Sequence, residues 1–215
     1  MDIYQFISEN ISHIENPIVF EIGSHIGIDS EKISEIVGSK IYGFEPDPRN
    51  LEILTSKRSE FFHEISTLAI SNNDGKSNFY LSSGTAPEEY EDEDMNRDWS
   101  ASNSLKLPRK HLDLHQWCKF DWCIEVETIK LDTYCKNKNI DHIDFIWMDV
   151  QGAEDLVIEG MGDFKNNIRF IYTEYNNDDL YDGSPTLEKI VSMLGEGWSI
   201  EKVYENDVLL KNNNI

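Results

Sequence analysis

The sequence is short of cysteine and of long apolar runs, and each shortage excludes a class of protein. Its three cysteines, Cys118, Cys123 and Cys135, are odd in number and form no C-x-x-C pair, so no disulfide framework is indicated. No apolar run is long enough to cross a bilayer. Residues 1–6 lack the basic and apolar regions of a secretory signal. We therefore expect a cytoplasmic protein with buried free thiols and no membrane partner.

Basic residues are also scarce. The chain has 19 Lys and Arg residues against 41 Asp and Glu residues, which gives a formal net charge of −22. Such a charge repels phosphate backbones, so we expect no nucleic-acid partner. With 215 residues and no linker rich in Pro, Gly or Ser, the chain is expected to form a single domain over residues 1–215.

Apolar patterns of strand and helix type alternate from residue 17 to residue 195. Strands are expected at 19–22, 40–45, 61–70, 78–81, 123–128, 143–148 and 168–173, with a closing hairpin over 198–203 and 208–211. Helices are expected within residues 1–16, ending near Gly38, beginning at Asp47–Pro48, over 131–138, after Gly152, and beginning at Ser184–Pro185. The alternation predicts an α/β fold, with a mainly parallel sheet and helices on both faces.

Residues 82–120 break this alternation, and we expect them to form an insertion or a lid. Within them, the acidic block 88–94 cannot bury its charges and predicts a solvated, mobile loop. A spacing compatible with zinc is shared by His111, His115, Cys118 and Cys123. Such residues beside tryptophans more often have packing roles. His111 is also a candidate general base if the insertion folds over the cleft.

A glycine turn follows the first expected strand, and the rest of the chain is organised around it. Glu21 lies at the end of the strand, and Gly23, Ser24, His25 and Gly27 follow it before a helical pattern begins. Glycines allow the backbone to bend sharply and to approach a ligand closely, and the next helix presents free N–H groups. This segment therefore predicts a cofactor-binding turn at the carboxyl end of the strand.

A second part of the cofactor site is expected at the tip of the next strand. Glu45, followed by Pro46, lies there, and an acid at this point in nucleotide-binding α/β units accepts hydrogen bonds from both ribose hydroxyls. Residues near Thr67 and Ala69, on the third strand, would then border the adenine. Because ligands bind beyond the carboxyl ends of parallel strands, one cleft is expected to collect these residues.

The glycine spacing distinguishes between two classes of cofactor. A nicotinamide dinucleotide favours G-x-G-x-x-G, whereas this chain has Glu-x-Gly-x-x-x-Gly. This turn, with Glu45 beyond it, resembles the first cofactor motifs of class I S-adenosylmethionine-dependent methyltransferases. Residues 143–154, IDFIWMDVQGAE, resemble the I-D-x-x-K-I-D-V-E-G-A-E signature of the FkbM family. The sequence departs from that family's pattern at His25, Trp147 and Gln151.

The FkbM resemblance implies a Rossmann-like three-layer sandwich whose mainly parallel seven-stranded sheet has an antiparallel last strand. It also implies S-adenosylmethionine as cofactor and O-methylation, often of a sugar hydroxyl on a natural product or glycan. By position, Glu21, Gly23 and Gly27 would surround the methionine moiety and Glu45 would hold the ribose. The expected acceptor is a small molecule or a glycan.

Acids at strand ends are the candidates for catalysis. Methyl transfer is an in-line displacement, and a sugar hydroxyl must lose its proton as it attacks. Asp149, after the fourth strand, is the first candidate for general base and also borders the cofactor; Glu154 and Glu174 are the second candidates. The alternative role for Asp149 is capping the helix that begins near Gly152.

Three further alternatives remain open. Asp149, Glu174 and Asn176 form an all-oxygen set for a divalent metal, which is less favoured than a metal-free site. An NAD-dependent oxidoreductase or epimerase is opposed by the glycine spacing and by the lack of a Tyr-x-x-x-Lys pair. A noncatalytic module that keeps the cofactor fold is permitted by the unusual His25 and Gln151.

Overall fold

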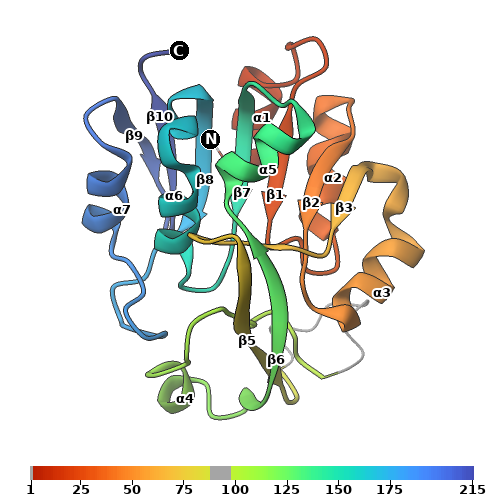
Figure 1. The fold of residues 1–215 in the computed structure, drawn as a ribbon, viewed down its shortest axis with the longest axis vertical. Helices are drawn as coiled ribbons and strands as arrows, with labels where there is room; N and C mark the ends of the chain where they lie inside the picture. Colours follow the sequence, from red (N-terminus) through yellow and green to blue (C-terminus); the bar gives the residue numbers. More distant parts are fainter. Residues whose placement is uncertain (1, 88–97) are drawn as a thin grey trace.

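The computed structural model describes residues 2–87 and 98–215 (Figure 1). The acidic block 88–94, expected as a solvated loop, lies outside the described residues. In the part of the chain that is described, no helix has both the length and the apolar character needed to cross a bilayer.

Seven strands form the main sheet, in the order β3-β2-β1-β7-β8-β10-β9 (Figure 1). They are β1 (Val19–Ile22), β2 (Ile41–Phe44), β3 (Phe62–Ser66), β7 (Ile143–Met148), β8 (Ile168–Glu174), β9 (Trp198–Val203) and β10 (Asp207–Asn212). Parallel pairing joins the first five in this order, whereas β10 runs antiparallel to β8 and β9. The expected Rossmann-like sheet with an antiparallel last strand is confirmed.

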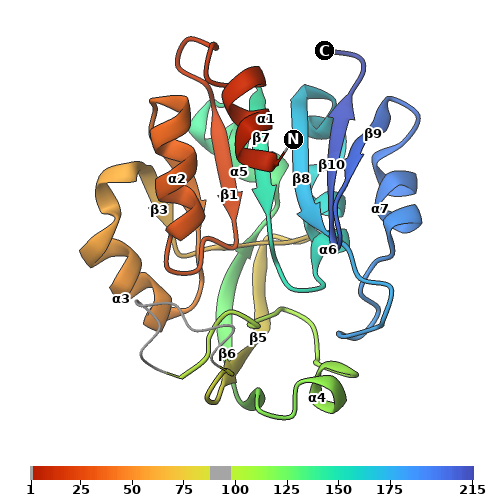
Figure 2. The same cartoon turned by 180° about the vertical axis from the view of Figure 1, so that it is seen from behind.

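Helices cover both faces of the sheet (Figures 1 and 2). One face carries α1 (Ile3–Asn10), α2 (Ile28–Val37) and α3 (Pro48–Lys57), and the other carries α5 (Leu131–Lys138), α6 (Glu154–Met161) and α7 (Leu187–Leu194). Each helix presents apolar side chains to the sheet, as its spacing in the sequence requires. Removing this surface from water is the main stabilising contribution to such a fold.

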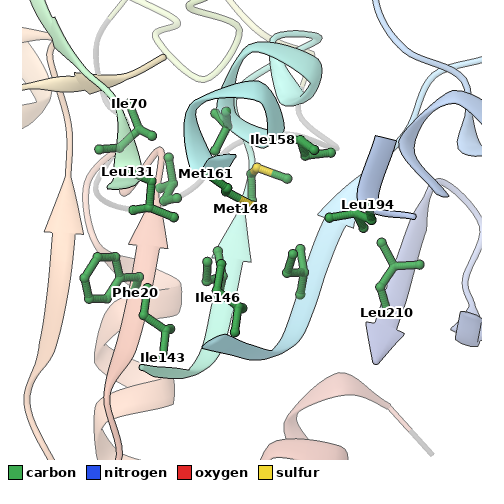
Figure 3. Packing of buried hydrophobic residues seen from close by; sticks show 14 of the residues in the cluster. Phe20, Ile70, Leu131, Ile143, Ile146, Met148, Ile158, Met161, Leu194 and Leu210 are labelled. Atoms are coloured by element: carbon green, nitrogen blue, oxygen red, sulfur yellow. The ribbon is translucent and has the colours of Figure 1, made fainter. Parts of the chain in front are cut away.

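Alternation along the central strands decides which side chains reach which helix layer. Phe20 and Ile146 point toward α5 and α6, where they pack with Leu131 and Met161 (Figure 3). Val19 points to the opposite layer, beneath α1 and α2. Because side chains of a strand alternate, Glu21 lies on the α1–α2 side of β1, at the strand's carboxyl end. The pairing register places Trp147 of β7 beside Glu21.

A second sheet lies beyond the carboxyl ends of β1, β2 and β7, next to α4 (His111–Leu114) (Figure 1). It contains β4 (Ala69–Ile70), β5 (Gly75–Ser83) and β6 (Lys119–Ile129), in the order β4-β6-β5. The predicted single strand over 61–70 is therefore wrong. β3 ends at Ser66, whose hydroxyl accepts the N–H of Leu68, and the chain then turns to pair Ala69 with Thr128.

The strands predicted at 78–81 and 123–128 are longer than expected and pair antiparallel with each other. They form a separate sheet with β4 and do not join the main one, so the alternation of the main sheet is interrupted after β3 and resumes with α5. Strand propensity in these segments was visible in the sequence. Their partner depends on long-range pairing, which local patterns do not encode.

Several helix ends follow the predicted local chemistry. Gly38 ends α2 with a left-handed φ of 64°, and the Asp47 side chain caps α3 by accepting the N–H of Arg49. The predicted start of α7 at Ser184–Pro185 is wrong, because the side chain of Thr186 caps the helix by accepting the N–H of Lys189. Asp149 is not a helix cap either, since α6 begins at Glu154.

Candidate active site

A cavity of about 370 Å³ lies at the carboxyl ends of β1, β2 and β7 and is closed on the far side by residues of the second sheet and the insertion. This size is within the range of small-molecule sites. Five predicted cofactor residues from the first two strands line it: Glu21, Gly23, Ser24, His25 and Glu45. Pro46, Ala69 and Asp149 line it as well. The cleft expected from strand order therefore collects most of the predicted residues.

The glycine turn holds the end of β1 close to the end of β7. Gly23 has a φ of 89°, and a Cβ at this position would lie 1.8 Å from the backbone oxygen of Asp149. Gly23 and Ser24 both donate their N–H groups to the carbonyl of Phe44 on β2, each at 3.0 Å. A glycine is required at position 23 because any side chain would push the two strand ends apart.

Glu45 is tied to the glycine turn through its carboxylate. Its Oε2 accepts the backbone N–H of His25 at 2.8 Å, and its Oε1 accepts the backbone N–H of Asp47 at 2.7 Å. The side chain is buried, and this burial raises its pKa to about 8. Each carboxylate oxygen has a second lone pair, so Glu45 keeps acceptor capacity for ligand hydroxyls in the cavity.

Glu21 is a buried acid with one unpaired carboxylate oxygen among the described residues. It is 2% exposed, lines the cavity, and within the described residues its Oε2 has no hydrogen-bond partner. Burial, together with the charge of Asp29, raises its pKa well above the usual range. A buried carboxylate oxygen left unpaired is costly, so this atom fits a cationic group of a ligand.

Three polar side chains meet beyond the ends of β7 and β8. The Nε2 of Gln151 donates to Oδ1 of Asp149 at 2.7 Å and to Oε2 of Glu174 at 3.1 Å. Burial raises the pKa of Asp149 to about 6, and the neighbouring charge of Asp149 raises the pKa of Glu174 well above its usual range. The two carboxyls therefore titrate together, and Asp149 is the one that ionises first as the pH rises.

Glu154 supports this group from the first turn of α6. It is buried, and its Oε1 accepts the backbone N–H of Gly152 at 3.1 Å. Burial raises its pKa to about 7. Neither Glu154 nor Glu174 is among the residues that line the cavity, and both contact the 149–152 turn behind it.

The insertion contributes one wall of the cavity, which the sequence did not identify. Ser100, Ala101, Asn103 and Leu105 line it. The hydroxyl of Ser100 lies 2.9 Å from Nε2 of His25 and donates to Oδ1 of Asn50 at 2.7 Å. His25, which departs from the family's pattern, therefore connects the glycine turn to the insertion.

A buried polar network holds this wall against α3. Nδ2 of Asn103 donates to Asp47 at 2.7 Å, and its Oδ1 accepts the backbone N–H of Ser82 at 2.7 Å. Arg49 pairs with Asp47 at 2.7 Å and donates to the carbonyl of Ser82 at 3.1 Å. The partners of Asn103 lie more than twenty residues away in the sequence, so no local signal identified them.

Some predicted site residues lie elsewhere. Thr67 is exposed and does not line the cavity. Gly27 is also absent from its lining and packs toward Arg58 and Leu54 of the α3 region. His111 is buried, with Nε2 3.2 Å from the hydroxyl of Ser102, and its burial lowers its pKa to about 4. A histidine in this place is neutral and packs beneath the cavity wall.

The described part of the chain contains no cluster of side chains for either metal site considered in the sequence analysis. Over residues 2–87 and 98–215, no group of three or more His, Cys, Asp and Glu side chains is arranged to hold an ion. Asn176 turns back on its own loop, where its Oδ1 accepts the N–H of Asp178 at 2.7 Å.

Cys118 is buried whereas Cys123 is exposed, which also corrects the expectation that all thiols are buried.

Comparison with known proteins agrees with this geometry. A family model of the methyltransferase FkbM domain matches residues 21–204. The 2-O-methyltransferase NoeI of Sinorhizobium fredii is 35% identical over 208 residues, which cover 92% of this chain and 80% of that protein. The chain belongs to the FkbM methyltransferase family. It is accordingly an S-adenosylmethionine-dependent methyltransferase, and the oxidoreductase alternative is wrong.

Solved structures of methyltransferases resemble this FkbM protein only remotely. Fibrillarin of Aeropyrum pernix, with bound S-adenosyl-L-methionine, has 11% identity and a TM-score of 0.46 and covers 96% of this chain and 73% of its own. An rRNA methylase of Streptococcus thermophilus has 11% identity and a TM-score of 0.46, with coverage of 97% and 93%. Similarity at this level carries no information about the ligands of this chain.

Proposed function

We propose that this FkbM methyltransferase transfers a methyl group to a hydroxyl of an uncharged sugar or similar small acceptor, with Asp149 as general base. The observation that carries the proposal is the juxtaposition in one cavity of three elements. These are the glycine turn with the unpaired Glu21 oxygen, the Glu45 carboxylate, and the ionised Asp149. The first two suit the cofactor, and the third suits the acceptor.

The cofactor's charges and hydroxyls match these residues. Oε2 of Glu21 suits the ammonium of the methionine moiety, because it is buried and lacks a partner among the described residues. Glu45 suits the ribose hydroxyls, since His25 and Asp47 already orient its carboxylate. Ala69 and Phe79 supply apolar surface for the adenine. Pro46 lies beside Glu45 in the same lining.

In the proposed reaction the acceptor oxygen forms a bond to the methyl carbon, the carbon–sulfur bond of the sulfonium breaks, and its electron pair stays on sulfur. The acceptor's proton passes to Asp149. Gln151 donates to Oδ1 of Asp149, and the acceptor hydroxyl is placed at Oδ2. With a pKa of about 6, Asp149 is ionised at neutral pH and ready to accept this proton.

The charge of the cavity limits the acceptor class. Glu21, Asp29, Glu45 and Asp149 line it, and Lys32 is the one lysine or arginine in the described lining. Lys32 lies 3.8 Å from Asp29, which offsets its charge. Burial keeps Glu21 and Glu45 largely protonated at neutral pH, so the charge that an acceptor meets is mainly that of Asp149, which repels an anionic acceptor such as a phosphorylated sugar. The net charge of −22 opposes nucleic acid more generally. A neutral polyhydroxyl compound fits.

The proposal is tested by transfer of a labelled methyl group from S-adenosylmethionine to a panel of neutral methyl glycosides, their phosphorylated counterparts and simple phenols. We expect transfer to a neutral glycoside. Asp149→Asn should reduce turnover by about 10²–10⁴-fold while it keeps binding S-adenosylhomocysteine. Cofactor binding without transfer to any member of the panel would favour the noncatalytic alternative, and preferred transfer to phosphorylated acceptors would contradict the charge argument.

A further inference from the structure

Tyr181 lies directly beneath the turn that carries Gln151, and the reaction described above gives it no role. It is 1% exposed and belongs to the loop between β8 and α7. A Cβ on Gly152 would lie 2.8 Å from the Tyr181 ring, so the turn rests on the ring without space between them. The ring also packs against His111, at 5.4 Å between centroids.

The Tyr181 hydroxyl reaches two acceptors. Its single proton lies between the backbone carbonyl of Ser102, at 2.8 Å, and Oε1 of Gln151, at 3.2 Å, and the two acceptors share it. Among the described contacts, the one with the Tyr181 hydroxyl is the one that fixes the oxygen end of the Gln151 amide. The nitrogen end of the same amide contacts Asp149 and Glu174. The orientation of the amide is therefore set on both sides.

The backbone of Gln151 is held as well. Its φ of 52° is left-handed, which is unfavourable for a residue with a side chain. The hydroxyl of Ser104, from the insertion, donates to its carbonyl at 2.7 Å. Ser104 is itself paired with Tyr80 of β5. Residues of the insertion and of the β8–α7 loop thus hold the glutamine in a conformation it would not otherwise prefer.

We propose that Tyr181 is a positioning residue, which orients the Gln151 amide so that its two N–H groups reach Asp149 and Glu174 together. A neutral donor between two acids lets them lie close without a counterion. It favours the ionised form of Asp149, the form that accepts the acceptor's proton. The kinetic part of this inference rests on the proposed role of Asp149, whereas the structural part does not.

The acids around Asp149 make the hydrogen bond from the Gln151 amide important for the ionisation of Asp149. The groups that face Asp149 come from five elements: Glu21 of β1, Asp29 of α2, Glu154 of α6, Glu174 of β8 and Asp207 of β10. All five are acids, and the charges of Asp207 and Asp29 raise the pKa of Asp149. Loss of the Gln151 hydrogen bond should therefore raise the pKa of Asp149, and the acid limb of the pH–kcat profile should move to higher pH.

Tyr181→Phe tests the inference because it keeps the ring and removes the hydroxyl. We expect the acid limb to move up by about half a pH unit or more and plateau kcat to fall by roughly tenfold. Affinity for S-adenosylhomocysteine should stay within about twofold, because Tyr181 does not line the cavity. Gln151→Met should give the same shift, and adding Tyr181→Phe to it should shift the limb no further. Tyr204→Phe is the matched control, because within the described residues its hydroxyl has no hydrogen-bond partner.

A second readout does not depend on activity. In ¹⁵N-labelled protein, the side-chain NH₂ signals of Gln151, identified by their loss in Gln151→Met, should titrate with the acids in the wild type. In Tyr181→Phe they should move toward free-glutamine positions. Gln151 signals that are the same in Tyr181→Phe as in the wild type would overturn the inference. So would a Tyr181→Phe substitution that shifts the acid limb equally in the wild-type and Gln151→Met backgrounds. Absence of methyl transfer with the expected NMR changes would overturn the proposed function alone.

Discussion

The backbone N–H of His25 donates to the carboxylate of Glu45 across 2.8 Å, and this bond joins the glycine turn after β1 to the tip of β2. The two segments are twenty residues apart in the sequence. Their contact places the part of the cavity suited to a methionine moiety next to the part suited to a ribose. Both parts are lined by acids whose pKa is raised by burial, and this has consequences for stability.

The free energy of unfolding of the ligand-free protein should fall as the pH rises from about 5 to about 8. Glu45, Glu154 and Asp149 have pKa values raised to about 8, 7 and 6. Between the unfolded and folded pKa values the native state binds more protons than the unfolded chain, so rising pH favours unfolding. The loss should be on the order of a few kcal/mol, measured by urea denaturation at pH 5.5 and 8.5. Glu45→Gln should flatten the dependence, and a stability that rises over this window would refute the argument.

Gly23→Ala should prevent stable folding or cofactor binding. Its methyl group would lie 1.8 Å from the backbone oxygen of Asp149, and its φ of 89° disfavours a side chain. Gly38→Ala is the control, because it also has a positive φ but no atom within 4 Å of the added carbon. It should cost only about 1 kcal/mol. Similar thermal midpoints for the two variants would show that the close approach at Gly23 is unimportant.

Asn103→Ala should destabilise the protein and weaken cofactor binding together. The amide links Asp47 at the start of α3 to the buried N–H of Ser82 on β5, so its loss leaves a buried donor unpaired. The expected cost is about 1–3 kcal/mol. Asn73→Ala, on the exposed turn before β5, should change stability by less than about 0.5 kcal/mol. Equal effects of the two substitutions would argue against the network.

Local patterns in the sequence predicted most of the main sheet, because its central strands β1, β7 and β8 are short apolar runs. The sequence also predicted the position of Glu45. An acid at the carboxyl end of a parallel strand lies where ligands of such sheets bind. The second sheet was not predicted. β5 pairs with β6 across residues far apart in the chain. Neither strand has a sequence pattern that indicates which strand it pairs with.

The same limit applies to the candidate site. Asp149 and Glu174 stood out as acids at strand ends, but the role of Gln151 between them depends on side-chain orientation, which no spacing predicts. Tyr181 gave no signal at all, because its contacts with Gln151 and Ser102 join loops that are far apart in the sequence. His111 stood out for its chemistry, yet burial makes it a packing residue.

Calorimetric titration with S-adenosylhomocysteine of the wild type and of Glu45→Ala tests the central claim most directly. That claim is that the glycine turn and Glu45 hold one cofactor together. The wild type should bind, and Glu45→Ala should lose about tenfold or more in affinity while remaining folded by circular dichroism. A folded wild type that does not bind, or a variant that binds as tightly as the wild type, would contradict it.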